Sequence, residues 1–225
     1  ADAGATWLKN PDPATNVSFS SVVINGSTIL AGVSFPNPGV VLKSVNGGST
    51  WTSLTISANN KVRDLYFQGT DLYANVHYVG VYKSTDNGAN WQLNRSVPTD
   101  SRLLVTPTSI YSLSAHKVSV SSNGGVSWTE NSAATPSYFG VVLYATNSYL
   151  FIGSLGGGVF RNNVGAAAAW ETVNTGLLCF DVNDIEVVNN SILLGTEHSF
   201  IRKSNDEGNT WSQLIDSYGL PSTRG

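Results

Sequence analysis

The sequence predicts an all-β protein, a β-propeller built from four-stranded antiparallel blades. Three observations predict it: tryptophans at a nearly constant interval, a short phrase before most of them, and short apolar runs separated by turn residues. A propeller blade uses four strands in about 40 residues, which matches this interval. The tryptophans are Trp7, Trp51, Trp91, Trp128, Trp170 and Trp211, with spacings of 44, 40, 37, 42 and 41 residues.

The phrase before the tryptophans combines a serine, an aspartate or asparagine, and a glycine at fixed offsets. It reads SVNGGSTW at 44–51, STDNGANW at 84–91, SSNGGVSW at 121–128 and SNDEGNTW at 204–211. The N-terminus carries the end of another copy, DAGATW at 2–7. The copy before Trp170 has decayed to NNVG followed by four alanines.

Each residue type of the phrase has a structural task. The aspartate or asparagine oxygen accepts backbone N–H bonds inside a tight turn, and glycine adopts a conformation in which a Cβ would clash. The indole buries a large apolar area between adjacent sheets. We therefore assign structural rather than catalytic or calcium-binding roles to Asp2, Asn46, Asp86, Asn123 and Asp206, to Gly48, Gly88, Gly125 and Gly208, and to Trp7, Trp51, Trp91, Trp128, Trp170 and Trp211.

The phrase resembles the Asp box, or BNR repeat, of sialidases and their relatives, and the resemblance extends over essentially the whole chain. It implies a β-propeller. It does not choose a function, because Asp boxes also occur in xyloglucan-active hydrolases, photosystem assembly factors, sortilin-type receptors and other exported proteins.

The runs between the boxes give five sets of four strands and almost no helix. The repeats span roughly residues 10–54, 55–94, 95–131, 132–173 and 174–215 of a single domain that covers 1–225, with an extra outer strand at 5–9. We expect five blades; the alternative is that the chain forms part of a six- or seven-bladed ring. An open array would leave exposed sheet edges, which favour aggregation.

Composition excludes several classes. A net charge of −3 with no basic cluster argues against a nucleic-acid partner, and no apolar run is long enough to insert in a membrane. The single cysteine, Cys179, rules out an intrachain disulfide or a multi-cysteine zinc site, and we expect neither a metal nor a cofactor. Low charge with many Ser, Thr and Asn favours a secreted or cell-surface protein, expected to be monomeric. We expect that a signal preceding Ala1 has been removed or that the chain is part of a longer protein.

Polar residues at the end of each blade opposite the boxes form the candidate ligand site. The loops between second and third strands contain all three histidines, and the entries to the first strands contain further charged and aromatic residues. The candidate ligand-binding residues are His77, Tyr78, His116, Glu197, His198, Arg63, Asp64, Arg102, Tyr138 and Asp181. Three interpretations are open: these residues are polar because loops face solvent, they form a recognition surface, or they form a catalytic or metal site.

A sialidase activity is not favoured. A member of that family should carry three arginines that bind the substrate carboxylate and an Arg-Ile-Pro motif, yet the motif is absent and only Arg63 and Arg102 belong to the candidate end. We therefore expect no catalytic residues and a non-enzymatic module that recognises a glycan or a protein at one face. The alternatives are a glycoside hydrolase related to sialidases and a structural domain of a large exported adhesin.

Overall fold

The computed structural model describes residues 17–35, 39–56, 60–97, 101–114, 117–131, 139–165, 169–197 and 201–214. Strands and tight turns make up this part of the chain, which contains no helix. The described residues accordingly offer no helix that could cross a membrane. The chain divides into two compact units, one formed by residues 1–114 and 119–129, the other by residues 115–118 and 130–225.

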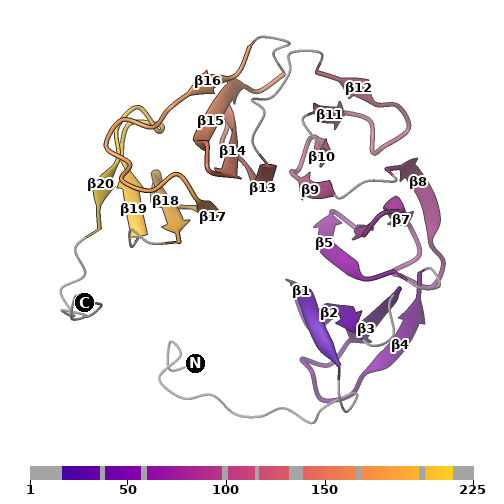
Figure 1. Ribbon diagram of the computed structural model, residues 1–225. Helices are drawn as coiled ribbons and strands as arrows, with labels where there is room; N and C mark the ends of the chain where they lie inside the picture. Colours follow the sequence, from indigo (N-terminus) through magenta and orange to yellow (C-terminus); the bar gives the residue numbers. More distant parts are fainter. Residues whose placement is uncertain are drawn as a thin grey trace. The chain divides into compact units, whose positions relative to one another are not determined.

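The first unit holds sheets 1 and 2 and most of sheet 3, each with four antiparallel strands (Figure 1). Sheet 1 consists of β1 (Ser18–Asn25), β2 (Thr28–Phe35), β3 (Val40–Ser44) and β4 (Thr52–Thr55). Sheet 2 consists of β5 (Val62–Gln68), β6 (Asp71–Val76), β7 (Gly80–Ser84) and β8 (Gln92–Ser96). Sheet 3 consists of β9 (Ser101–Val105), β10 (Ile110–Ser114), β11 (Lys117–Ser121) and β12 (Thr129–Glu130).

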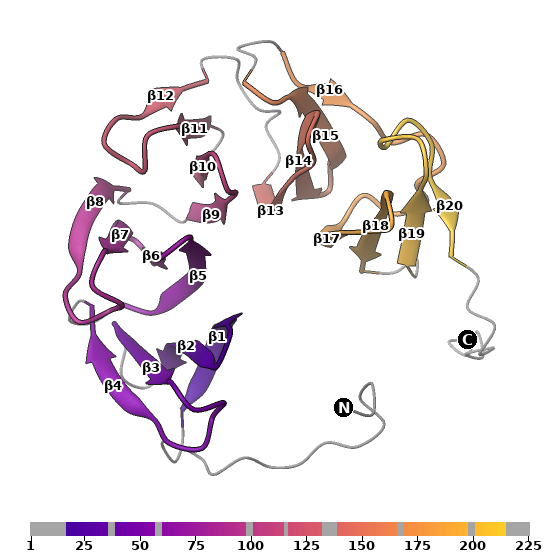
Figure 2. The same cartoon turned by 180° about the vertical axis from the view of Figure 1, so that it is seen from behind.

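The second unit holds sheets 4 and 5, which can be followed from both sides in Figures 1 and 2. Sheet 4 consists of β13 (Phe139–Ala145), β14 (Tyr149–Leu155), β15 (Gly158–Asn163) and β16 (Glu171–Thr172). Sheet 5 consists of β17 (Val182–Val188), β18 (Ser191–Thr196), β19 (Ile201–Ser204) and β20 (Ser212–Gln213). In all five sheets the strands are hydrogen-bonded in sequence order, as expected for successive hairpins.

The predicted fold class, an all-β propeller of four-stranded antiparallel blades, is confirmed, with five such sheets in the chain. The fourth strand of each sheet begins one residue after the tryptophan of its repeat. The predicted extra strand at 5–9 lies outside the described residues.

The first strands of four sheets carry an irregularity close to their start. In β5 the register skips Arg63, since Val62 pairs with Val76 and Asp64 with Asn75. Strands β1, β13 and β17 shift register in the same place. A bulge of this kind bends the strand and re-aims the extra side chain. The bulges therefore lie at the end of the sheets where the candidate site was expected.

The hydrophobic core of each unit lies between successive sheets. Leu30 and Val41 of sheet 1 pack with Val62 and Leu65 of sheet 2, and all are buried. Sheets 2 and 3 pack through Tyr73, Val81, Leu103 and Ile110. In the second unit Phe151 and Val159 of sheet 4 pack with Val182, Ile185 and Leu194 of sheet 5. Burial of these apolar faces is the main force that stacks one sheet on the next.

Candidate functional site

Each box folds into the same hydrogen-bonded corner between the third and fourth strands. In sheet 2, Ser84 donates its hydroxyl to Asp86 Oδ1 over 2.8 Å and accepts the N–H of Gly88 over 2.9 Å. Asp86 Oδ1 also accepts the N–H of Asn90 over 2.8 Å. The corresponding bonds recur with Asn46, Asn123 and Asp206 at the centre. The oxygen of each of these residues is thus occupied by the turn itself.

The two carboxylates at these corners have unusually low pKa values. The backbone N–H and side-chain amide of Asn90, followed by the Ser84 hydroxyl, lower the pKa of Asp86 to about 2. The Thr210 and Ser204 hydroxyls, followed by the Thr210 N–H, lower the pKa of Asp206 to about 2. A strong, permanently ionised acceptor suits a structural corner and does not suit a general acid, which needs a pKa near the working pH.

Four of the tryptophans that the structure describes, Trp51, Trp91, Trp128 and Trp211, pack in hydrophobic clusters, and the indole N–H groups differ in their partners. Trp51 and Trp128 donate to the carbonyls of Gly48 and Gly125 in their own boxes, over 3.0 and 3.1 Å. Trp211 is almost fully buried between sheets 4 and 5 and donates to the Val173 carbonyl over 2.7 Å. The indole N–H groups of Trp91 and Trp170 are buried and have no partner.

A cation directly before the first box residue links each of three corners to the previous sheet, a feature that sequence reasoning missed; that first residue is Ser44 or Ser84 and, in the decayed box, Asn162. Lys43 donates to the Asn87 carbonyl over 2.6 Å, and Lys83 donates to the Gly124 carbonyl over 3.3 Å. Arg161 donates to the Glu207 carbonyl over 2.6 Å. Each acceptor is the residue directly after the box aspartate or asparagine. The signal in the sequence was the basic residue directly before the first position of the box.

The decayed fourth corner follows a different pattern. Arg161 is buried, contacts Glu171 through a 2.7 Å ion pair and lies 4.5 Å from the centroid of the Tyr149 ring. The turn continues into Gly165, which has a φ of 78°. The first box, with Asp2 and Trp7, lies outside the described residues.

At the opposite end of sheet 2, His77 and Tyr78 follow β6. We call this end, defined by residues 61–64, 77–80 and 101–102, the loop end of the first unit. The His77 N–H donates to the Lys61 carbonyl over 3.0 Å, which places the β6–β7 loop beside the entry to β5. Tyr78 adopts a φ of 58°, and 56% of its surface is exposed. Its ring centroid lies 3.9 Å from that of His77, with the planes tilted by 42°.

The positive φ of Tyr78 is a strained conformation for a bulky residue and costs about 1–2 kcal/mol. The turn that enforces it is tight: Val79 donates to the Val76 carbonyl, and Val97 donates to the Val79 carbonyl. Gly80 follows with a φ of 136°, and a Cβ there would lie 2.0 Å from the Arg95 carbonyl oxygen. Backbone packing therefore holds the Tyr78 ring outward.

The charged candidates of the first unit divide into structural and surface groups. Asp64 Oδ2 accepts the amide of Asn75 over 2.8 Å and the N–H of Leu103 over 3.2 Å. Asn75 is buried and also exchanges hydrogen bonds with Ser101. Asp64 therefore joins sheet 2 to sheet 3. Arg63, on the bulge, and Arg102, at the start of β9, are half-buried at the same end.

In the second unit the equivalent end of sheet 5 carries Asp181 and Glu197. Asp181 directly precedes β17 and Glu197 directly follows β18. The Glu197 N–H donates to the Asp181 carbonyl over 3.1 Å, so the two residues are neighbours at this end of the strand pair. Asp181 is half-buried and Glu197 is exposed. Three further candidates, His116, Tyr138 and His198, lie outside the described residues.

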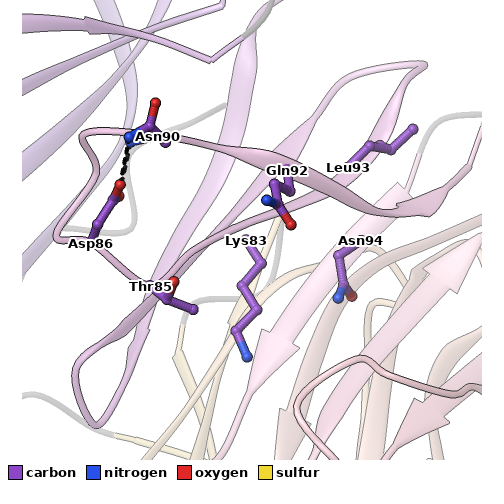
Figure 3. A pocket seen from close by; sticks show the side chains of 7 residues that line it. All are labelled: Lys83, Thr85, Asp86, Asn90, Gln92, Leu93 and Asn94. Atoms are coloured by element: carbon purple, nitrogen blue, oxygen red, sulfur yellow. Dashed lines mark hydrogen bonds between the residues drawn. The ribbon is translucent and has the colours of Figure 1, made fainter.

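A small polar hollow lies near the box corner of sheet 2, where no site was expected (Figure 3). Its volume is about 160 Å³, below the 300 Å³ or more typical of pockets for small organic ligands. It is lined by Lys83, Thr85, Asp86, Asn90, Gln92, Leu93 and Asn94. Lys83 and Asp86 already serve the corner, so the hollow suits ordered water rather than a ligand.

Comparisons with known proteins give one partial relative and no matching family model. A xyloglucanase from a Paenibacillus species is 25% identical over 142 residues, which cover 58% of this chain and 14% of the xyloglucanase. The chain thus spans about one seventh of that relative's length.

The solved structures that are similar over most of the chain include the following two. YCF48 bound to a D1 peptide superposes with a TM-score of 0.76 at 19% identity, covering 98% of this chain and 75% of that one. The GH74 enzyme of Niastella koreensis superposes with a TM-score of 0.66 at 22% identity, covering 90% and 32%. At such identities the likeness shows the fold alone: this chain has the β-propeller fold of four-stranded blades.

Proposed function

We propose that this chain is a non-enzymatic, extracellular module that binds a glycan at the loop end of its first unit. The observation that carries the proposal is Tyr78, an exposed aromatic ring held outward by a strained backbone. Strain of this kind persists only where the surrounding structure enforces it, and it concentrates at binding sites. Sugar rings present apolar faces that stack on such a ring.

The neighbours of Tyr78 complete the chemistry. His77 packs beside the ring and limits its movement, which lowers the entropy cost of binding. Arg63 and Arg102 belong to the same end and supply donors for sugar hydroxyl oxygens. The likeness to a xyloglucanase, although partial, supports a polysaccharide ligand.

The absence of catalysis in this proposal rests on the role of Asp64. Its Oδ2 accepts two hydrogen bonds that join sheets 2 and 3, so it serves the packing of the blades. Both corner carboxylates, Asp86 and Asp206, are likewise committed to their turns.

The test is a polysaccharide array followed by calorimetry with xyloglucan oligosaccharides. We expect saturable binding without release of reducing sugar. Tyr78→Ala should weaken the affinity about tenfold or more, as for an aromatic anchor at a binding site. The matched control is Leu93→Ala, which removes an exposed apolar side chain near the box corner and should leave binding unchanged. Failure of every glycan to bind, or equal binding by both variants, would refute the proposal.

A glycoside hydrolase is the second candidate, favoured by one observation. Asp181 and Glu197 are neighbours on the adjacent strands β17 and β18, and the Cβ atoms of such neighbours lie roughly 5 Å apart. Retaining glycosidases hold two carboxyl groups at about 5–5.5 Å. Reducing sugar released from xyloglucan by the native chain, and lost at least about a hundredfold in Glu197→Gln, would establish this candidate in place of the first.

A further inference from the structure

The dipeptide Asn-Gly occurs four times in the chain, at 25–26, 46–47, 87–88 and 123–124. At this dipeptide an asparagine side chain loses its amide most readily, because glycine has no side chain to hinder attack by its backbone nitrogen. The nitrogen bonds to the side-chain carbonyl carbon, ammonia leaves, and a five-membered succinimide ring remains. All four copies belong to the first unit, so their surroundings can be compared directly.

The copy at the corner of sheet 1 has its reacting amide held at both ends. Asn46 Oδ1 accepts the Ser44 hydroxyl and the Thr50 N–H, both over 2.9 Å, and its Nδ2 donates to Thr50 Oγ1 over 2.9 Å. The nitrogen that would attack is that of Gly47, and its N–H donates to the Ser27 carbonyl over 3.0 Å. Ring closure at Asn46 therefore requires these bonds to break first.

The copies at the next two corners are also held by hydrogen bonds. Asn123 Oδ1 accepts the Ser121 hydroxyl and the Ser127 N–H over 2.9 Å each, and its Nδ2 donates to Ser127 Oγ over 2.8 Å. In the corner of sheet 2 the attacking nitrogen is held instead, because the Gly88 N–H donates to Ser84 Oγ over 2.9 Å and Gly88 is buried. All three corner copies must therefore open locally before they can react.

The copy at 25–26 lies in an exposed turn. Asn25 ends β1 and pairs with Thr28, so Asn25 and Gly26 lie at the tip of the β1–β2 hairpin. Both residues are exposed, and within the described part of the chain the Asn25 side chain makes no hydrogen bond. Gly26 has a φ of 61°, and a Cβ built on it would meet no atom within 4 Å, so the tip has room for the ring.

We propose that Asn25 is a site of spontaneous modification in the folded protein, and that the fold protects the three corner copies. The Gly26 nitrogen attacks Asn25 Cγ and gives its proton to solvent. The Cγ–Nδ2 bond breaks, and Nδ2 takes a proton from solvent and leaves as ammonia. Water then opens the ring at either carbonyl. The products are an aspartyl residue and an isoaspartyl residue, whose backbone is longer by one methylene.

Modification of this hairpin also bears on the first box corner. The Ser27 carbonyl accepts the Gly47 N–H of that corner. An isoaspartyl residue lengthens the backbone between Ile24 and Thr28 and so shifts this carbonyl, whereas an aspartyl residue leaves the backbone unchanged. Both products add a negative charge to the net charge of −3, so anion exchange separates them from the unmodified chain.

Mass spectrometry of the aged protein tests all four copies at once. Trypsin places each copy in a different peptide, 10–43, 44–61, 84–95 or 118–161, and fragment ions assign the modified residue. The chain is incubated in mildly alkaline buffer, folded and, in parallel, unfolded in urea. In urea we expect similar rates at the four copies, since glycine follows each asparagine. In the folded protein Asn25 should keep a rate near its unfolded value, and the corner copies should slow at least about tenfold.

The matched variant is Ser121→Ala, which removes one donor to Asn123 Oδ1. It should raise the folded-state rate at Asn123 and leave that at Asn25 unchanged, and circular dichroism checks that it folds. Asn25→Gln should abolish the fast modification of peptide 10–43, since glutamine closes its ring far more slowly. The proposal is overturned if folding slows Asn25 as much as Asn123, or if any corner copy keeps its unfolded rate.

Discussion

The two ends of sheet 2 use the same backbone conformation for opposite purposes. At the box corner Asn87 has a φ of 62°, and at the loop end Tyr78 has a φ of 58°. Asn87 tolerates this conformation well, its carbonyl accepts Lys43, and its surroundings recur in other sheets. Tyr78 tolerates it poorly, and its ring is exposed.

The difference teaches where to look for function in a repeated fold. At the corners, the polar groups of the repeated residues hydrogen-bond to one another, and these bonds hold the turn. At the loop end, each sheet carries different residues, and at least one accepts strain without a packing gain. Repetition within the chain thus marks scaffold, and departure from the repeat marks the candidate site.

The largest expected effect on stability comes from removing a box tryptophan. Trp211→Ala should lower the free energy of unfolding by roughly 3–5 kcal/mol, since the indole is buried between sheets 4 and 5 and donates to Val173. Urea denaturation followed by circular dichroism measures it. A loss below about 1 kcal/mol would mean that the indole does not hold the two sheets together.

Acid should destabilise the corners that contain an aspartate and leave the stability of those that contain an asparagine unchanged. The folded pKa of Asp86 and of Asp206 is about 2, below the unfolded value near 3.8. The unfolded chain therefore binds more protons as the pH falls. The stability that these groups contribute is complete above about pH 4 and is lost towards about pH 2.

Denaturation midpoints measured from about pH 5 to about pH 2 follow this loss. Replacing both residues, Asp86→Asn with Asp206→Asn, should flatten the curve in that window, because the corners at Asn46 and Asn123 hold without a charge. An unchanged acid dependence in the double variant would place the titrating groups elsewhere.

The smallest expected effect on stability concerns Tyr78, the residue of the proposed glycan site. Tyr78→Gly should stabilise the fold by up to about 1 kcal/mol, since glycine adopts a positive φ freely, while glycan binding is lost. Asn87→Gly is the matched control at the box corner, and its stability should change by less than about 0.5 kcal/mol because asparagine tolerates this region. Chemical denaturation compares the two. A destabilised Tyr78→Gly would show that the ring packs for stability.

Sequence reasoning reached the scaffold because its signals are local. The box spans eight residues, and the hydrogen bonds that its first serine and its aspartate or asparagine make within it join residues at most four apart, such as Ser84, Asp86 and Asn90. Strand pairing follows from hairpins whose apolar pattern is readable along the chain. The same reasoning grouped Asp64 with the ligand-binding candidates, because its partners Asn75 and Leu103 are 11 and 39 residues away.

The sequence by itself determined the repeat, the four-stranded sheets and the residues that close their corners, since these depend on short-range geometry and on the alternation of apolar side chains. Only the tertiary structure decided that Lys43, Lys83 and Arg161 bind a carbonyl of the next corner and that the Tyr78 ring is held outward. These properties depend on which distant sheet lies against a residue, and no local pattern encodes that.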